Sequence, residues 1–344
     1  MPAVGALRHG DGVVSWLTRA APRGHRVAMR SLRAWLVADH PRGGSMVIAV
    51  VRVTLGLMWL SNLGWKTPPD FGKGPPAYGL YTFVAGAVSH PVLPPYSWVI
   101  EQLVLPHYTV FGWATLAVET LLAALLLTGT LTRVAALLGI VQSVAIGLSV
   151  LAAPGEWPWS YVLMAAAHAG VLAAAPARVP GVDAALLSQR GERAARASRQ
   201  LVGWGAAAAG VGLWSAAGSL GDPLASAGTR PGISVLQLSF GQFNLLGGLV
   251  MLALGAALLT AGARRRPGLA LGAAAVAGVA ALSVVARWGF GSVPLGADGG
   301  STGLLLALVL VAGVLGRAMR SDARRAGGLD PAATARRPGA SVRG

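Results

Sequence analysis

The sequence predicts an all-α, polytopic membrane protein with about eight transmembrane helices. Of the 344 residues, 54% are hydrophobic and only 12% are charged, whereas a soluble domain carries about twice that charged fraction. The apolar residues come in long blocks, and these blocks lack the period-two alternation of a transmembrane β-barrel. Arginines cluster beside the blocks. Together these observations indicate that lipid surrounds most of the chain.

Eight apolar blocks carry this prediction, because each is close to the length that crosses a bilayer as a helix. The first four belong to a predicted four-helix membrane domain at 46–190, and the last four to a second four-helix unit at 201–319. A basic connector at 191–200 joins them, and we expect a basic tail at 1–45 and a disordered tail at 320–344. The blocks run over about 46–65, 108–128, 133–153, 159–175, 201–219, 243–261, 269–287 and 302–319.

The basic N-terminal segment allows two interpretations. Met29, Leu32 and Trp35 share one face of 27–37, which predicts a short amphipathic helix on the membrane surface. A mostly disordered tail explains the same composition equally well. A secretory signal needs an apolar core, and the segment contains none.

The charge distribution predicts the membrane topology. The net charge of +16 would by itself suggest nucleic-acid binding. However, the arginines concentrate in both tails and in every second connector, whereas the other connectors hold few basic residues. This is the positive-inside pattern of a multi-pass protein. We therefore expect a bacterial plasma membrane (cell inner membrane) protein with both termini in the cytoplasm and no nucleic-acid partner.

Several kinds of chemistry are excluded by composition and motif. The chain has no cysteine, so disulfide exchange, thioether-linked haem and cysteine-ligated iron–sulfur clusters cannot occur within it. It also lacks a phosphate-binding loop, a dinucleotide fingerprint after a strand, and a helical pair of metal ligands. We predict no metal site and no covalently bound cofactor.

Four polar residues, one in each of the first four apolar blocks, are predicted to form a buried layer. Arg52, Glu119, Gln142 and His168 each lie roughly 9–14 Å above the cytoplasmic boundary at the helical rise. Arg52 and Glu119 have opposite charges at this depth, so we expect them to pair. Glu119 and His168 are the candidate catalytic residues, because both can carry a proton. The alternatives are a salt bridge that only registers two helices and a histidine that only packs.

A second predicted cluster lies at the outer membrane face. Lys66 follows the first block and precedes two prolines and an aromatic residue, which fixes a cation at a rigid bend. Such a cation suits an anionic ligand or a quinone oxygen; the alternative is a snorkelling anchor paired with Asp70. The candidate cofactor-binding residues are Lys66, Arg52, Trp65 and Glu156, and the cluster also holds Glu101 and His107.

The segment Arg52-Val-Thr-Leu-Gly-Leu-Met-Trp-Leu-Ser-Asn-Leu-Gly-Trp-Lys-Thr-Pro-Pro-Asp-Phe71 resembles the first helix of the DoxX/DoxD family. Its Lys-x-Pro-Pro continuation resembles the DoxD branch, the small subunit of thiosulfate:quinone oxidoreductase. Glu119 midway in the second helix, Gly129 before the third, and Arg178-Val-Pro-Gly-Val-Asp183 after the fourth fit the same pattern. The resemblance covers about residues 46–190. It implies a membrane subunit of a quinone-linked oxidoreductase in sulfur-compound oxidation or membrane redox defence.

The sequence is compatible with three functions. In the first, residues 46–190 bind a quinone, and a partner protein or the substrate supplies the electrons, since the chain holds no redox motif of its own. In the second, the chain is a carrier or channel for a small solute, although no internal repeat of the kind common in transporters is evident. In the third, it is a non-catalytic membrane scaffold for a protein partner.

Overall fold

The computed structural model of the chain describes residues 41–228, 239–287, 290–291 and 293–327. The possible amphipathic helix at 27–37 and most of the basic tail at 1–45 lie outside these residues. The same holds for 328–344 within the predicted disordered tail.

All four helices predicted in the first half are present. They are α3 (Pro41–Ser61), α6 (Tyr108–Thr128), α7 (Thr132–Val150) and α8 (Pro158–Ala173). The apolar blocks had placed three of them within a few residues, whereas α3 begins five residues before the predicted Met46 and ends before the predicted Trp65. Helix α6 ends at Thr128, and the next residue, Gly129, has a φ of 65°, a left-handed conformation that terminates helices at little cost for glycine.

Seven of the described helices are long and apolar enough to cross a membrane: α3, α6, α7, α10, α11, α12 and α13. This shows a mostly helical, multi-pass architecture. The predicted span that is not among these seven is the fourth, 159–175, which corresponds to α8; this helix has 16 residues and covers about 24 Å at the helical rise. It is therefore shorter than the other seven.

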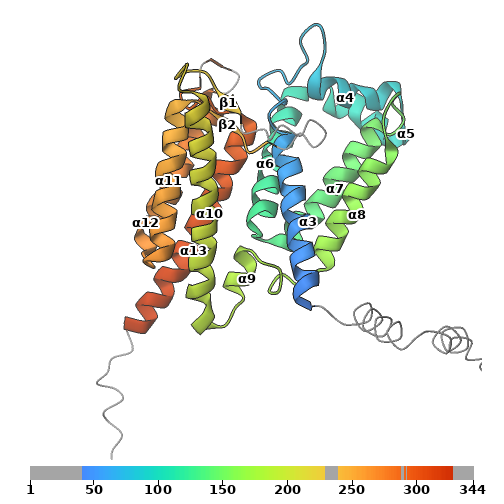
Figure 1. Cartoon of the computed structure of the whole chain (residues 1–344). Helices are drawn as coiled ribbons and strands as arrows, with labels where there is room; N and C mark the ends of the chain where they lie inside the picture. Colours follow the sequence, from blue (N-terminus) through green and yellow to red (C-terminus); the bar gives the residue numbers. More distant parts are fainter. Residues whose placement is uncertain (1–40, 229–238, 288–289, 292, 328–344) are drawn as a thin grey trace, which may run out of the picture. The chain divides into compact units, whose positions relative to one another are not determined.

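The long connector between α3 and α6 forms a cap over one end of the first four helices (Figure 1). It contains α4 (Gly79–Ser89), α5 (Pro94–Val99) and a single π-helical turn, η1 (Ile100–Val104). The connector dips into the bundle at Phe71, whose side chain is fully buried, and the backbone oxygen of Phe71 accepts a hydrogen bond from the Tyr108 hydroxyl at 3.1 Å. We call this end of the helices the cap end.

The second half consists of α10 (Arg190–Gly218), α11 (Leu245–Ala263), α12 (Pro267–Arg287) and α13 (Gly299–Gly327), with α9 (Val182–Leu186) before it. The predicted basic connector is part of α10, which begins at Arg190 rather than at Leu201. Likewise α13 extends to Gly327, so residues 320–327 are helical rather than disordered. Between α10 and α11, β1 (Ala227–Gly228) pairs antiparallel with β2 (Gln242–Phe243).

The two halves meet along α13, which packs against α6, and the described residues from Ser45 onward form one compact unit. The core of this contact includes Leu60 and Leu63 at the end of α3, which lie beside Gly303 of α13. Arginines gather at the end opposite the cap, where Arg190 of α10, Arg265 of the α11–α12 connector and Arg325 of α13 line one pocket. We call this the arginine-rich end.

Candidate functional site: a buried lysine–glutamate pair

The most unusual feature of the interior is an ion pair between Lys66 and Glu119. The Lys66 Nζ lies 2.6 Å from a Glu119 carboxylate oxygen, and the two side chains are 2% and 1% exposed. Lys66 follows α3 in a turn that directs its side chain into the bundle, where its Nζ also donates to the Asn62 backbone oxygen at 2.8 Å. Its Nζ stands 4.2 Å from the ring centroid of Trp65, a contact that stabilises a cation.

Gln142 of α7 completes the cluster. Its Nε2 donates to the other Glu119 oxygen at 3.2 Å, so three elements converge on one carboxylate. Unlike its partners, Gln142 is only half-buried, and the neighbouring Val141 and Val144 of α7 are exposed. The amide therefore connects the buried charges to the outer surface of α7.

Charge burial of this kind is costly. Moving an ion from water into an apolar interior costs several kcal/mol even after relaxation, and an apolar pair of similar volume is often no less stable. Within the described residues the other two ion pairs, Arg193–Asp322 and Arg196–Glu192, are partly exposed. An ionisable pair inside an apolar helical bundle is therefore better evidence of function than of stability.

The predicted pairing of Arg52 with Glu119 is wrong. The Arg52 guanidinium instead donates to the backbone oxygens of Leu126 at 2.6 Å and Pro180 at 2.7 Å. Leu126 lies seven residues beyond Glu119 on α6, which is about 10 Å along the helix axis. Equal depth was counted from the cytoplasmic ends of the predicted spans, but Leu127 in the last turn of α6 lies beside Gly56 of α3, so the two helices do not end at one level.

Arg52 belongs to a structural junction at the end of α6. Asp183 accepts hydrogen bonds from the backbone N–H groups of Leu131 and Thr132 at 2.9 and 2.8 Å, and so caps α7. The Asp183 backbone N–H donates to the Gly129 oxygen at 2.9 Å. A side chain at position 129 would collide with the Arg52 guanidinium, so this position accommodates only glycine. Arg52, Gly129 and Asp183, which belong to the DoxX-like pattern, thus hold the α6–α7 turn together.

His168 is fully buried and hydrogen-bonded on both ring nitrogens. Its Nε2 accepts from the Trp59 indole at 3.1 Å, which leaves Nδ1 to donate to the Met164 oxygen at 2.7 Å. Both contacts are satisfied by the neutral ring. The arrangement matches the packing histidine that we considered as the alternative to a proton relay, and Gly139 of α7 leaves room for the imidazole.

The predicted outer cluster separates in the structure. Lys66 is buried rather than exposed, and Asp70 accepts from the Gly72 N–H instead of pairing with it. Glu156 accepts from the Tyr161 hydroxyl at 2.8 Å, and His107 contacts the Leu103 oxygen. Of the expected partners, Trp65 alone stays beside Lys66. Among the residues that the structure describes, no group of three His, Asp or Glu side chains is arranged to hold a metal ion.

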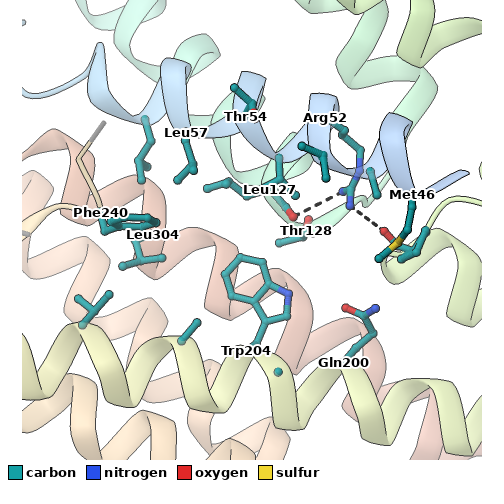
Figure 2. Close-up of a pocket in the computed structure, with 18 of the residues that line it drawn as sticks. Met46, Arg52, Thr54, Leu57, Leu127, Thr128, Gln200, Trp204, Phe240 and Leu304 are labelled. Atoms are coloured by element: carbon teal, nitrogen blue, oxygen red, sulfur yellow. Dashed lines mark hydrogen bonds between the residues drawn. The ribbon is translucent and has the colours of Figure 1, made fainter. Parts of the chain in front are cut away.

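A groove of about 580 Å³, which was not predicted from the sequence, lies between α3 and α10. Figure 2 shows Arg52 and Leu57 directed into it from α3, and Gln200 and Trp204 directed into it from α10. The exposed Met46 and Val50 stand at its rim, which opens it to the protein surface. Among the residues that the structure describes, no aspartate or glutamate lines the groove.

Comparison with family models, with curated proteins and with solved structures found no match to this chain.

Proposed function

We propose that this chain is an integral membrane subunit of a quinone-linked oxidoreductase of DoxX/DoxD type. The observation that carries the proposal is the buried Lys66–Glu119 pair with Gln142 bonded to it. The resemblance of residues 46–190 adds the reaction class, either sulfur-compound oxidation or membrane redox defence. Its electrons come from the substrate or from a partner protein, because the chain has no redox motif of its own.

The chemistry of the cluster suits a quinone. Reduction of a quinone to a quinol takes two electrons and two protons, and a carboxylate relay is one way to bring protons through an apolar bundle. In the proposal Glu119 carries the proton, and the Lys66 ammonium polarises a quinone oxygen. Gln142 is the member that reaches the surface of α7, so a bilayer quinone approaches from that side.

Two of the residues predicted as functional have structural roles in this proposal. Arg52 has two backbone acceptors, and both nitrogens of His168 are occupied. Trp65 keeps a role, since its ring lies beside the Lys66 ammonium and shields it from water.

The proposal includes the membrane topology. The ends of α7 and α8 nearest Asp183 lie together, because Asp183 follows α8 and caps α7. We propose that α8 crosses the membrane antiparallel to α7 as the eighth span. With eight crossings both termini lie on one side of the membrane, and the arginine-rich connectors support the proposal that this side is the cytoplasm of a bacterial cell.

The test compares the wild-type chain with the double variant Lys66→Met/Glu119→Leu, which removes both charges while conserving much of the volume. Each full-length chain is purified in mild detergent, and the co-purifying quinone and proteins are identified. Quinone reduction is then measured in the host membranes with thiosulfate, the donor that the resemblance names. We expect the double variant to fold and its rate to fall by about 10²-fold or more, as for loss of an acid–base group.

Glu101→Gln is the matched control, because Glu101 is an exposed carboxylate of the cap and should tolerate the change. If membranes with the double variant reduce quinone at the wild-type rate, the proposed role of the pair is ruled out. If the double variant co-purifies with the same proteins as the wild-type chain, and the wild-type chain carries no quinone, the protein is better described as a non-catalytic scaffold.

A further inference from the structure

We propose that the groove between α3 and α10 binds one anionic phospholipid, with its phosphate at the arginine-rich end and one acyl chain along the groove. This inference does not depend on the redox function. It rests on the polarity of the two ends of the groove and on the lack of acidic residues in its lining.

One end of the groove presents hydrogen-bond donors. Arg199, Gln200 and the indole N–H of Trp204 line it from α10, and Arg52 lines it from α3. Within the described part of the chain Arg199, Gln200 and Trp204 have no hydrogen-bond or ion-pair partner, and the Arg52 Nε also has none. Arginine and indole groups donate only, so this end is complementary to an oxyanion.

The remainder of the groove is apolar. Ala207 and Val211 continue along α10, Leu57 and Leu60 lie opposite on α3, and Leu304 and Phe240 close the far side. An apolar groove that begins at the guanidinium groups of Arg199 and Arg52 matches an acyl chain below a phosphate. It does not match free phosphate, which would leave the apolar part unfilled.

The position along the helices selects a phospholipid over a quinone. Arg199 continues the basic first turns of α10, which contain Arg190, Arg193 and Arg196. Basic side chains of this kind accumulate at the level of lipid headgroups and bind anionic lipids. A quinone carries no net charge and gains little from two guanidinium groups at that level.

Gly203 offers a way to block the groove without disturbing the fold. It lines the groove on α10, it is exposed, and an added Cβ would meet no atom within 4 Å. Gly203→Leu therefore places a side chain in the space assigned to the acyl chain. Gly272→Leu is the matched control, because Gly272 is also an exposed helical glycine with open space around it but lies on α12, outside the groove.

The experiment measures lipid retention and thermal stabilisation of the full-length chain in detergent. We expect wild-type protein to retain phosphatidylglycerol over phosphatidylcholine and to be stabilised by added phosphatidylglycerol. Gly203→Leu should lower retention by about tenfold or more, and Gly272→Leu should not. Arg199→Gln, which removes one charged hydrogen bond, should weaken binding by about tenfold, while Arg196→Gln, already paired with Glu192, should not.

Four results would overturn the proposal. They are equal retention of phosphatidylcholine, equal stabilisation by inorganic phosphate, replacement of the lipid by menaquinone or ubiquinone in the purified protein, and equal losses with Arg196→Gln and Arg199→Gln. The last would mean that general surface charge, rather than the groove, attracts the lipid. Because Lys66 and Glu119 are unchanged in every variant, failure here leaves the redox proposal standing.

Discussion

The two halves of the protein hold their helices together by different means. In the first half, side chains bond across helices: Lys66 to Glu119, Trp59 to His168, and Arg52 to the end of α6. In the second half, α10 and α11 bring their backbones into contact through glycines. Polar side chains tolerated in an apolar bundle indicate a chemical task, whereas close glycine packing only needs shape.

The glycine contact follows a repeat of seven residues. Gly205 and Gly212 of α10 face Gly255 and Gly248 of α11, and Gly262, seven residues further along α11, faces Ser198 and Val202. An added Cβ at Gly255 would stand 2.6 Å from the backbone nitrogen of Ala209, and one at Gly212 would stand 2.6 Å from that of Leu252. Since lipid tails are as apolar as the helices, this close fit provides the dispersion that holds the pair.

The largest effect should come from breaking the buried ion pair on one side only. Lys66→Met leaves the Glu119 carboxylate buried without a cation, and Glu119→Leu leaves the Lys66 ammonium without an anion. Each should lower the free energy of unfolding by about 3–5 kcal/mol, and the double variant should recover most of it. Unfolding midpoints in detergent measure this. A double variant as unstable as the single ones would show that the pair is a net stabilising contact.

A smaller loss should follow from filling the glycine contact. Gly255→Leu forces α10 and α11 apart, because the obstructing atoms belong to the Ala209 backbone and cannot rotate away. Overpacking of this kind costs about 1–3 kcal/mol, and Gly272→Leu on the exposed side of α12 serves as the control. Equal midpoints for the two variants would show that α10 and α11 are held by contacts other than their glycines.

The sequence was sufficient to predict the helices because their signal is local. Apolar blocks of the right length appear wherever a helix crosses the membrane, and α6 was predicted to the residue. The connector helix at 190–200 was missed for the same reason: its basic residues lower the hydropathy although they extend α10 without a break. Hydropathy reports solvent preference and does not locate helix ends.

The sequence singled out Lys66, Glu119 and Gln142 but assigned Lys66 to a different cluster from the other two. Glu119 and Gln142 were correctly grouped, yet depth counting matched Glu119 with Arg52 rather than with Lys66. The turn after α3 folds Lys66 back into the bundle, and no local pattern reveals that reversal. The groove could not be predicted at all, because Arg52 and Trp204 are distant in the sequence and meet only when the two halves pack.

The junction at the end of α6 should respond to loss of Arg52. Arg52→Met keeps an unbranched side chain but leaves the Leu126 and Pro180 oxygens without their donor. We expect a loss of about 2 kcal/mol in the free energy of unfolding, within the range for hydrogen bonds to charged groups. Arg133→Met changes an exposed arginine of α7 in the same way and should have little effect. If instead quinone reduction falls while the unfolding midpoint is unchanged, Arg52 has a role in the reaction.

The smallest expected effect concerns the cap of α7. Asp183→Ala removes the acceptor for the Leu131 and Thr132 N–H groups and should cost about 1 kcal/mol, as for loss of other helix caps. Asp183→Asn keeps one acceptor oxygen and should cost less. Neither variant should alter quinone reduction, because Glu119 lies ten residues before Gly129 on α6, which is about 15 Å along the helix axis from this junction. A loss of activity equal to that of the double variant would mean that the junction and the buried pair act as one unit, and the division between structural and chemical residues in the first half would fail.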